Sequence, residues 1–359
     1  MIERIEEGIV NKKNAESWLG SGSRLAVLPD GKYICVYNGE SGSGVNDFVP
    51  EVAYSDDGIN WTEPKALFPE YIGKKSISVS VRNTDDGRVS IAGWSADIAY
   101  DGEMWWSDEL SAMKRNQLVY TLSDDGYTFA PLSFIELPYY GAAEMPGGMQ
   151  VDKDGSMYIV YSPYPAIEAE AESDTNCLVM LKSTDGGKSW EHSKIARVDG
   201  KSLYAETWIA TLTDGAKMIT TWQTASETTP DMYLYSKDGK DFGDVLPLPF
   251  KGQSTALATL PDGRVIIAYN QRKESPIGVW VAVAKPDEFG FNMLSNECAW
   301  ESKTKNRKGD SESGDFSEWT SFAFGEPHVI PTEDGSYLLV FWYSEGGYNG
   351  IKTLKFKIV

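Results

Sequence analysis

The sequence predicts an all-β protein, a six-bladed β-propeller of four-stranded antiparallel blades. Two observations predict this fold: an Asp-Gly turn followed by an alternating strand recurs six times, and a second turn motif is interleaved with it. Asp-Gly between alternating apolar runs is a strong hairpin signal, because glycine supplies the positive φ that the turn requires. Two hairpins in roughly 60 residues make one four-stranded blade, and closing six blades into a ring leaves few strand edges exposed.

The six Asp-Gly turns set the period of the chain. Each strand after a turn ends in Tyr or Trp, seven or eight residues beyond the turn aspartate, and successive turn aspartates are 48 to 72 residues apart. The turn aspartates are Asp30, Asp86, Asp154, Asp214, Asp262 and Asp334. We expect all six turns on one rim of a single domain spanning residues 1–359, with a strand near residues 2–10 completing a blade and no long helix.

The interleaved motif combines Ser, Asp, Gly and an aromatic residue. Its copies are SDDGINW (55–61), SDDGYTF (123–129), STDGGKSW (183–190) and SKDGKDF (236–242), with a degenerate fifth at 284–291. In such a turn, Ser and Asp side chains bond nearby backbone groups while glycine takes the strained φ. The terminal aromatic residue is expected to pack between neighbouring units.

This second motif resembles the Asp box, or BNR repeat, a turn typical of sialidases and related β-propellers. The copy at 183–190 fits the pattern Ser-x-Asp-x-Gly-x-x-Trp in full, and the other three are shortened by one residue. The resemblance spans roughly residues 20–350 and is more specific for the fold than for the activity. It implies the sialidase superfamily, with the boxes as structural turns that carry no catalytic residue.

Composition excludes several other functions. With 33 Lys and Arg against 53 Asp and Glu, the net charge is −20, which disfavours binding to nucleic acid or to an anionic membrane. No apolar stretch is long enough to cross a membrane, and MIERIEEGIV does not resemble a signal peptide. With three cysteines, an odd number, these features predict a cytoplasmic protein, although a secreted protein trimmed of its leader would look the same. Because His192 and His328 are the only histidines, we do not expect a His-rich metal site, and we expect no cofactor. The channel carboxylates leave a divalent ion open as an alternative, although no ligand spacing supports one.

Two insertions interrupt the repeat. Residues 95–116 contain the adjacent Trp105 and Trp106, which would either stack on sugar rings or form a local apolar plug. Residues 294–321 are charged and rich in Ser, and would form either a lid or a solvated loop. Long loops on a rigid scaffold are usually functional or disordered.

The first strand of each propeller blade lines the central channel, and a ligand binds over one end of it. The turns mark the far end of these strands, so the strand starts lie near the ligand. Those starts hold Arg24, Glu144, Glu206, Gln253, Glu326 and His328. Glu206 and Glu326 share one register, eight residues before their turn aspartates. Converging carboxylates suit acid–base or nucleophilic chemistry on a glycoside; the alternative is a polar channel filled with water and structural hydrogen bonds.

The resemblance extends to individual residues. Sialidases place an arginine at the start of the first blade and an acid/base aspartate in the following loop, and Arg24 and Asp47 occupy matching places. Their glutamate before the fourth-blade turn, which activates a tyrosine nucleophile, matches Glu206. An arginine after the fifth-blade strand matches Arg272. The resemblance therefore implies a site that includes these four residues.

Two departures separate the chain from sialidases. The family's second arginine is expected where this chain reads MITTWQT (218–224), and its tyrosine where the chain reads Phe324-Gly-Glu-Pro-His. Bidentate arginine is the favoured way to hold a carboxylate. The loss of one arginine from the clamp argues for a different sugar or for relaxed recognition.

These features predict a sialidase-like exo-glycoside hydrolase that releases a terminal sugar, acidic or not, from a small-molecule or oligosaccharide substrate. The predicted catalytic residues are Asp47, Glu206, Glu326 and His328, which should converge with Arg24 and Arg272 around one pocket. The predicted substrate-binding residues are Arg24, Arg272, Glu144, Gln253, Trp105 and Trp106. The alternatives are a lyase or different exo-glycosidase using His328 with a carboxylate, and a non-catalytic glycan-binding propeller, since fold does not decide among them.

Overall fold

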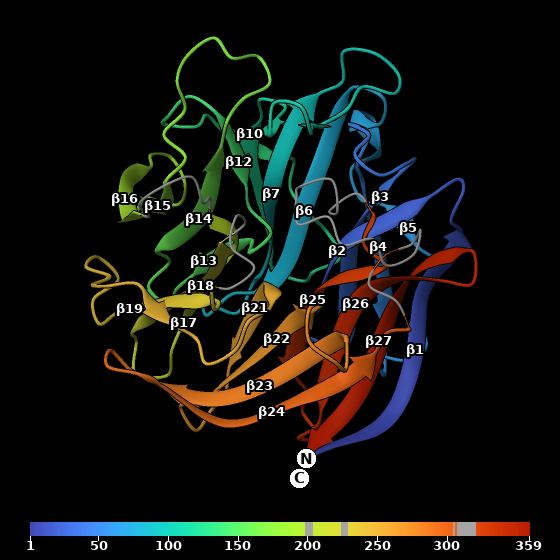
Figure 1. Ribbon diagram of the computed structural model, residues 1–359, viewed down its shortest axis with the longest axis vertical. Helices are drawn as coiled ribbons and strands as arrows, with labels where there is room; N and C mark the ends of the chain where they lie inside the picture. Colours follow the sequence, from blue (N-terminus) through green and yellow to red (C-terminus); the bar gives the residue numbers. More distant parts are fainter. Residues whose placement is uncertain (198–203, 224–228, 304–305, 307–320) are drawn as a thin grey trace.

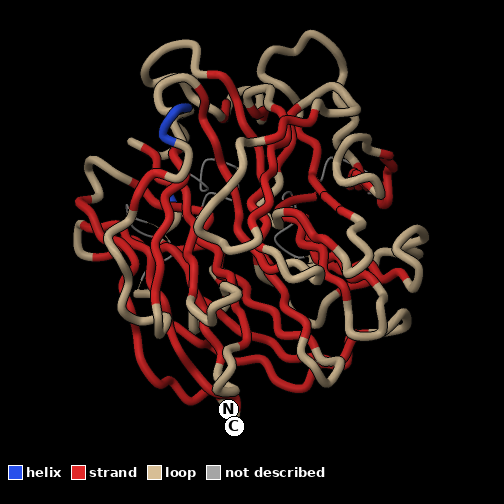
Figure 2. Tube along the Cα trace, turned by 180° about the vertical axis from the view of Figure 1, so that it is seen from behind, coloured by secondary structure: helices blue, strands red, loops and turns tan. Residues whose placement is uncertain are grey.

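A computed structural model describes residues 1–197, 204–223, 229–303, 306 and 321–359. Its strands form six antiparallel sheets that stand as blades around a central axis (Figure 1), which confirms the predicted six-bladed propeller. Strands dominate the trace, and the helical element with described bounds is one 3-10 turn, η1 (Pro69–Tyr71) (Figure 2). No helix in this part of the chain is long and apolar enough to span a bilayer.

Blades 1 to 5 follow the chain, each from its innermost to its outermost strand. Blade 1 consists of β2 (Leu19–Val27), β3 (Tyr33–Glu40), β4 (Val49–Ser55) and β5 (Lys65–Ala66), and blade 2 of β6 (Lys75–Asn83), β7 (Val89–Asp97), β10 (Gln117–Ser123) and β11 (Ser133–Ile135). In blade 3 the inner strand is broken into two segments that both pair with β14; its strands are β12 (Ala142–Glu144), β13 (Met149–Val151), β14 (Met157–Tyr164), β15 (Cys177–Ser183) and β16 (Glu191–Arg197). Blade 4 consists of β17 (Tyr204–Thr211), β18 (Lys217–Gln223), β19 (Met232–Ser236) and β20 (Leu246–Pro247), and blade 5 of β21 (Gln253–Thr259), β22 (Val265–Gln271), β23 (Gly278–Pro286) and β24 (Phe291–Glu301).

Blade 6 joins the two ends of the chain. Its strands are β25 (Phe324–Pro331), β26 (Tyr337–Glu345), β27 (Tyr348–Ile358) and, outermost, the N-terminal β1 (Ile2–Asn14). β1 pairs antiparallel with β27 from Ile2 opposite Ile358 to Asn14 opposite Tyr348, so the termini lie together (Figure 1). The N-terminal strand therefore completes a blade and closes the ring, as the sequence predicted.

Each Asp-Gly turn connects the first two strands of a blade. The six turn glycines have φ between 75° and 90°, a range that L residues rarely adopt. In every turn the glycine N–H donates to the backbone carbonyl three residues earlier, as from Gly31 to Leu28 at 2.9 Å and from Gly335 to Thr332 at 3.1 Å. These turns fix where each inner strand ends.

The four Ser-Asp turns share one hydrogen-bond pattern. The serine Oγ donates to the aspartate Oδ1 in each, at 3.0 Å for Ser55 and Asp57 and at 2.8 Å for Ser183 and Asp185. The same oxygen then accepts two backbone N–H groups from the turn, for example those of Ile59 and Asn60, both at 2.8 Å. The turns are thus satisfied by their own residues, as expected of structural elements.

The core is divided among the blade interfaces. Six hydrophobic clusters each join one pair of neighbouring blades, and a seventh packs beside blades 2 and 3 around Trp94 and Trp106. Cys35 and Cys177 are buried in two of these clusters as free thiols. They behave there as small apolar residues.

The two insertions differ from their expected forms. Residues 294–301 belong to the long strand β24, so the expected loop at 294–321 starts too early. Of the remainder, only residues 302, 303, 306 and 321 are described. Residues 95–116 contain the end of β7 and a small hairpin, β8 (Trp106–Ser107) and β9 (Ala112–Met113). The strand continues past the predicted boundary because β24 pairs with β23 as far as Glu301, opposite Gly278.

Ring closure through β1 can be tested with neighbouring residues of opposite burial. Val10 is 5% exposed and packs in the cluster between blades 6 and 1, whereas Ile9 is 44% exposed. We expect Val10→Lys to lower the free energy of unfolding by at least about 2 kcal/mol, because it buries an unpaired charge. Ile9→Lys should change it by less than about 0.5 kcal/mol. Equal effects in denaturant titrations would contradict the role of β1.

Candidate functional site

Six residues, one from each blade, meet at one level of the channel. Each lies eight residues before its turn aspartate, and all six line a cavity of about 190 Å³ at the end of the channel remote from the Asp-Gly turns. The set, termed the ring residues, is Gly22, Ser78, Pro146, Glu206, Ser254 and Glu326. The turns fix the register of the inner strands, so equal spacing in the sequence becomes one level in space.

Four inner strands have an irregular register at the ring residue. There the backbone is left-handed, with φ of 61° at Gly22, 49° at Glu206, 54° at Ser254 and 47° at Glu326. A residue with a side chain in this conformation costs about 1–2 kcal/mol. Three such residues stand in consecutive blades, 4, 5 and 6, at a polar cavity. Strain concentrated in this way marks a candidate functional site, where bulges commonly re-aim side chains.

Glu206 and Glu326 are each bound by an indole N–H. In both blades the tryptophan stands sixteen residues after the glutamate, on the next strand. Trp222 Nε1 donates to Glu206 Oε2 at 2.6 Å, and Trp342 Nε1 donates to Glu326 Oε2 at 3.0 Å. Blades 4 and 6 thus present the same glutamate–tryptophan pair to the cavity.

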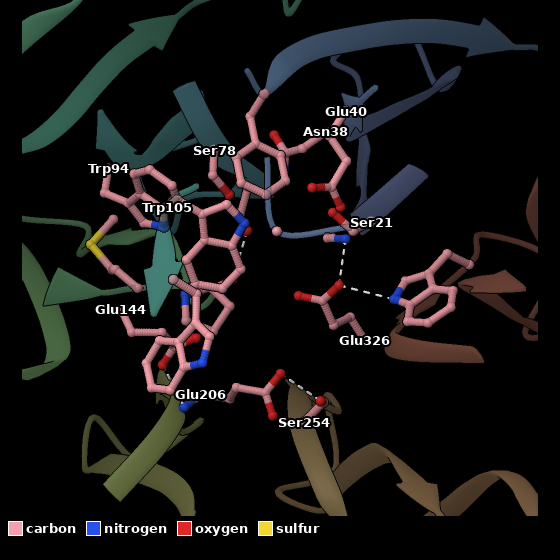
Figure 3. Close-up of a pocket in the computed structure, with 18 of the residues that line it drawn as sticks. Ser21, Asn38, Glu40, Ser78, Trp94, Trp105, Glu144, Glu206, Ser254 and Glu326 are labelled. Carbon is pink, nitrogen blue, oxygen red and sulfur yellow. Dashed lines mark hydrogen bonds between the residues drawn. The ribbon is translucent and has the colours of Figure 1, made fainter. Parts of the chain in front are cut away.

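A second donor orients each of these carboxylates. Ser254 Oγ donates to Glu206 Oε1 at 2.6 Å, and the backbone N–H of Gly22 donates to Glu326 Oε2 at 2.6 Å. Figure 3 shows both glutamates projecting into the cavity. Both oxygens of Glu206 are engaged, whereas Glu326 Oε1 has no hydrogen-bond partner among the described residues.

Glu144 supplies a third carboxyl from β12. Its Oε2 accepts the backbone N–H of Glu206 at 2.7 Å. Burial raises the pKa of Glu144 well above its usual value, and the charge of Glu206 adds to the shift. Burial likewise raises the pKa of Glu206, with the charge of Glu326 adding to it. Burial and mutual repulsion thus oppose the ionisation of both groups together. Among the described residues no three His, Cys, Asp or Glu side chains form a cluster suited to a metal ion.

Arg24, Trp208 and His328 pack together at the level below the ring residues, and none of them lines the upper cavity. Arg24 is 2% exposed and donates through Nη1 to the backbone oxygens of Ser23 and Glu326, at 2.9 and 2.7 Å. His328 stacks on Trp208 with ring centroids 4.8 Å apart. Burial lowers the pKa of His328 well below its usual value, with the charges of two arginines adding to this, so the ring is neutral. These three side chains form the floor of the site.

Beneath this floor lies a second cavity of about 230 Å³. Arg82 lines it and donates through Nη1 to the backbone oxygen of Gly147 at 2.9 Å and through Nη2 to Gln150 Oε1 at 2.7 Å. Burial lowers the pKa of Arg82 to about 10. Its guanidinium lies 4.9 Å from the Trp208 ring, and that of Arg24 lies 5.6 Å from the same ring. Both cations are therefore packed against the floor rather than presented to the upper cavity.

Aromatic side chains form another wall of the upper cavity. Trp94 and Trp105 lie across it from Glu326 (Figure 3). The Trp105 ring packs 6.0 Å from Phe48, 6.2 Å from Trp94 and 6.2 Å from Trp106, measured between ring centroids. The Trp pair thus both packs locally and lines the cavity, so the two alternatives raised by the sequence are compatible.

Glu103 anchors the segment that carries these tryptophans. Its carboxylate accepts the side-chain amide of Asn46 and the backbone N–H of Ala99, both at 3.0 Å, and pairs with Lys114 at 2.6 Å. The backbone N–H of Trp105 donates to Gly44 at 2.9 Å. The aromatic wall is therefore held by buried polar contacts between blades 1 and 2.

Seven of the predicted site residues line the upper cavity: Glu144, Glu206, Gln253, Arg272, Glu326, Trp105 and Trp106. Arg24 and His328 lie in the floor and not in the cavity lining, because the register of their strands shifts at the ring residue that precedes each of them by two positions. Asp47 does not reach the cavity lining; its Oδ1 accepts the backbone N–H of Ser41 at 3.1 Å within its own loop. The expected convergence of all the named residues around one pocket is therefore wrong for Asp47, Arg24 and His328.

Arg272 lines the cavity but is bound by neighbouring protein groups. Its Nη1 donates to Gln253 Oε1 at 2.5 Å, and its Nη2 donates to the backbone oxygen of Phe324. Its guanidinium also lies 3.7 Å from the centroid of the Phe322 ring. The two predicted arginines are thus both engaged with the protein.

Several site residues were not singled out from the sequence. In the sequence, Trp222 and Trp342 are marked as the ends of repeat strands, and only their constant spacing from the glutamates indicates that they belong to the site. Tyr164 lines the cavity, but nothing in its sequence context marks it. Asp231 lies buried near Glu206, and burial raises its pKa to about 8, so it is largely protonated at neutral pH. Such burial depends on loop packing that local patterns do not encode.

Comparison with known proteins supports the fold. No family model and no curated protein sequence matches the chain. Its structure is similar to that of a protein of unknown function from Dyadobacter fermentans, with 17% identity, a TM-score of 0.73 and coverage of 100% of this chain and 99% of that one. It is also similar to the Hadza microbial sialidase Hz136, with 14% identity and a TM-score of 0.63 over 95% of this chain and 66% of that one.

A leech intramolecular trans-sialidase, solved with 2,7-anhydro-Neu5Ac, gives 13% identity and a TM-score of 0.59 over 96% of this chain and 68% of that one. The chain thus spans about two thirds of the length of these two sialidases. At such identities the likeness concerns the fold alone, and the chain has a sialidase-like propeller fold.

The strained backbone at Ser254 predicts an unusual order of stability. Ser254→Gly and Ser254→Ala both remove the hydrogen bond to Glu206, but only alanine keeps a Cβ at φ 54°. We expect the glycine variant to be more stable than the alanine variant by about 1 kcal/mol in denaturant titrations. Ser80, on an inner strand without positive φ, is the matched control and should show the reverse order. Alanine being the better replacement at 254 would contradict the strain.

The raised pKa of Glu144 predicts a pH-dependent stability difference. A carboxyl whose folded pKa lies above its unfolded value loses stability as pH rises from the unfolded pKa towards the folded one. Glu144→Gln mimics the protonated form and keeps an oxygen for the Glu206 N–H. Its Tm should match the wild type near pH 4 and exceed it increasingly towards pH 8. Glu333→Gln, at an exposed turn on the opposite rim, is the control. A difference that does not grow with pH would contradict the raised pKa.

Proposed function

We propose that the protein is a glycoside hydrolase that removes a terminal sugar from a glycan. The observation that carries this proposal is the matched pair Glu206 and Glu326, held at one register in strained backbone and directed into a cavity with an aromatic wall. Two carboxyls flanking the bond are what glycoside hydrolysis requires. Indole faces suit the apolar faces of sugar rings. The sialidase-like fold is consistent with this chemistry.

The closed floor supports action on chain ends. Trp208 and His328 line the lower cavity and stack on each other, and the buried Arg24 packs on Trp208, so side chains fill the channel at this level. This packing disfavours the threading of a glycan through the channel. A single terminal unit entering from the rim would reach the carboxyls. This geometry favours an exo-acting enzyme over one that cleaves within a chain.

The surroundings of the two glutamates suggest separate roles. Burial and the charge of Glu326 raise the pKa of Glu206, so Glu206 suits the general acid that protonates the leaving oxygen. Glu326 keeps Oε1 open towards the cavity while Trp342 and Gly22 bind Oε2, so it suits the base or the nucleophile at the anomeric carbon. Asp47 and His328 receive no catalytic role in this proposal, because one lies outside the cavity and the other in its floor.

The site favours a glycosidase that differs from sialidases in its nucleophile. The place at which sialidases are expected to have their tyrosine holds Phe324. Tyr164 lines the cavity, but burial raises its pKa well above the usual value, with the charges of Glu144 and Glu206 adding to the shift. A phenolate is therefore disfavoured there, and the glutamates are the better candidates for the chemistry.

A glycan-binding propeller without catalysis is the second candidate. It is favoured by the absence of Asp47 from the cavity lining and by the complete set of donors on Glu206, which would also suit a purely structural carboxylate. Binding would then depend on the aromatic wall, and cleavage would not occur. The experiment below separates the two candidates.

We expect Glu206→Gln and Glu326→Gln to lower kcat by about 10²–10⁴-fold on any glycoside that the wild type cleaves. A panel of chromogenic neutral, amino and acidic glycosides would first identify that substrate. Tm should stay close to the wild-type value, because glutamine has nearly the same shape as glutamate and keeps one acceptor oxygen for the neighbouring donors. The exposed Glu333→Gln should keep full activity.

Near wild-type turnover in both glutamate variants would reject the assignment. Sugar-induced shifts in Tm without cleavage of any glycoside would instead support the binding propeller.

A further inference from the structure

Three carboxyls on inner strands line the cavity, whereas glycoside hydrolysis needs two. Glu206 and Glu326 suffice for the acid and for the base or nucleophile, which leaves Glu144 without a chemical role. We propose that Glu144 binds a protonated amino group of the terminal sugar, so that the substrate is an amino sugar and not an acidic one. This inference rests on the proposed function and names the substrate class of the same cavity.

Glu144 has an unused acceptor in the cavity. Its Oε2 is taken by the N–H of Glu206, but Oε1 has no hydrogen-bond partner among the described residues. A carboxylate removed from water is stable only when it is paired or protonated. Burial already drives the pKa of Glu144 upwards, so an ammonium group from a ligand would relieve the same cost. The vacant oxygen therefore favours a cationic donor.

Tyr164 provides an independent second group. Its side chain is 0% exposed and lines the cavity, yet its Oη has no partner among the described residues. β14, which carries Tyr164, pairs with β12, which carries Glu144, and Ala142 lies opposite Tyr164. A neutral phenol can accept an N–H bond from an ammonium group. The charge of Glu144 also acts on the Tyr164 phenol, which shows that the two groups are near each other. An unpartnered phenol near a carboxylate with a vacant oxygen suits a ligand with several N–H donors.

The charge balance of the lining disfavours an acidic sugar. The described lining holds Glu40, Glu144, Glu206 and Glu326 against one cation, Arg272. That cation donates to Gln253 and to the backbone of Phe324, and Arg24 lies in the floor. A ligand carboxylate would meet several acidic groups and no arginine held ready for it. A protonated amine would instead be attracted.

The aromatic lining strengthens this preference. Five indoles line the cavity: Trp94, Trp105, Trp106, Trp222 and Trp342. The face of an indole attracts a nearby ammonium group, and the attraction grows when water is excluded. The same faces bind the apolar side of a sugar ring. The cavity thus combines the groups that recognise an amine with those that recognise a sugar.

The test uses two series of related sugars in which one substituent is cationic, neutral or anionic. Affinities of the full-length protein are measured by calorimetry for glucosamine, glucose and glucuronate, and for galactosamine, galactose and galacturonate, at pH 6. A charge-assisted hydrogen bond is worth about 1.5–3 kcal/mol, or roughly ten- to hundredfold in affinity. We expect the amino sugar of at least one series to bind at least tenfold more tightly than its neutral partner, and the acidic sugar to bind most weakly.

Variants assign the preference to Glu144. Glu144→Gln should reduce the ratio of amino to neutral affinity by about tenfold, and Glu333→Gln should leave that ratio unchanged. Tyr164→Phe should reduce the ratio by a smaller factor, since it removes a neutral acceptor. If the ratio of amino-sugar to neutral-sugar affinity is unchanged in Glu144→Gln, Glu144 is not the group that binds the amine.

The outcomes separate this inference from the proposed function. Equal affinity for amino and neutral sugars, or tightest binding of an acidic sugar, would overturn the inference. Cleavage of a neutral or acidic glycoside would still uphold the hydrolase in that case. Amine-selective binding without cleavage of any glycoside would reject the hydrolase and support Glu144 as the amine-binding group. Failure of all six sugars to bind would overturn the inference, while cleavage of a glycoside would still uphold the hydrolase.

Discussion

The register that the Asp-Gly turns impose on six inner strands is the constraint on which the site depends. Each turn ends an inner strand at a fixed residue, and the pairing of β1 with β27 closes the ring so that all six strands face one axis. The residue eight positions before each turn is then brought to a common level, although neighbouring copies are separated by tens of residues in the chain. Side chains at that level meet because of ring closure, without any local sequence contact between them.

Two features at the level of the ring residues lower the stability of the fold. Glu206 and Glu326 occupy left-handed backbone, and three carboxyls share a confined cavity in which burial opposes ionisation of Glu144 and Glu206. Indole, hydroxyl and backbone donors offset part of the second cost. Neither feature is needed by the propeller, because blade 2 carries Ser78 at the same place with an unbroken register. Costs that the fold does not require are best explained by the function of the cavity.

The sequence predicted the fold and much of the cavity for one reason: both follow from a repeat. Constant spacing identified the blades, the closing N-terminal strand and the shared register of Glu206 and Glu326. The errors lie where the repeat gives no information. A bulge after the ring residue turns Arg24 into the floor, and a short loop satisfies Asp47 internally, at Ser41. Such one-residue shifts and loop hydrogen bonds depend on tertiary packing, which spacing alone does not reveal.

The position sixteen residues after each ring residue shows how a repeat can acquire a site without changing its fold. In blades 4 and 6 it holds the tryptophans that bind Glu206 and Glu326. In blade 1 it holds Asn38, whose side chain accepts the N–H of Val79 at 2.9 Å and donates to its carbonyl at 3.2 Å, tying blade 1 to blade 2. One register position thus serves blade adhesion in one copy and carboxylate positioning in others. Because the turns set the backbone independently of these side chains, the two positions can carry structural residues in one blade and cavity-lining residues in another.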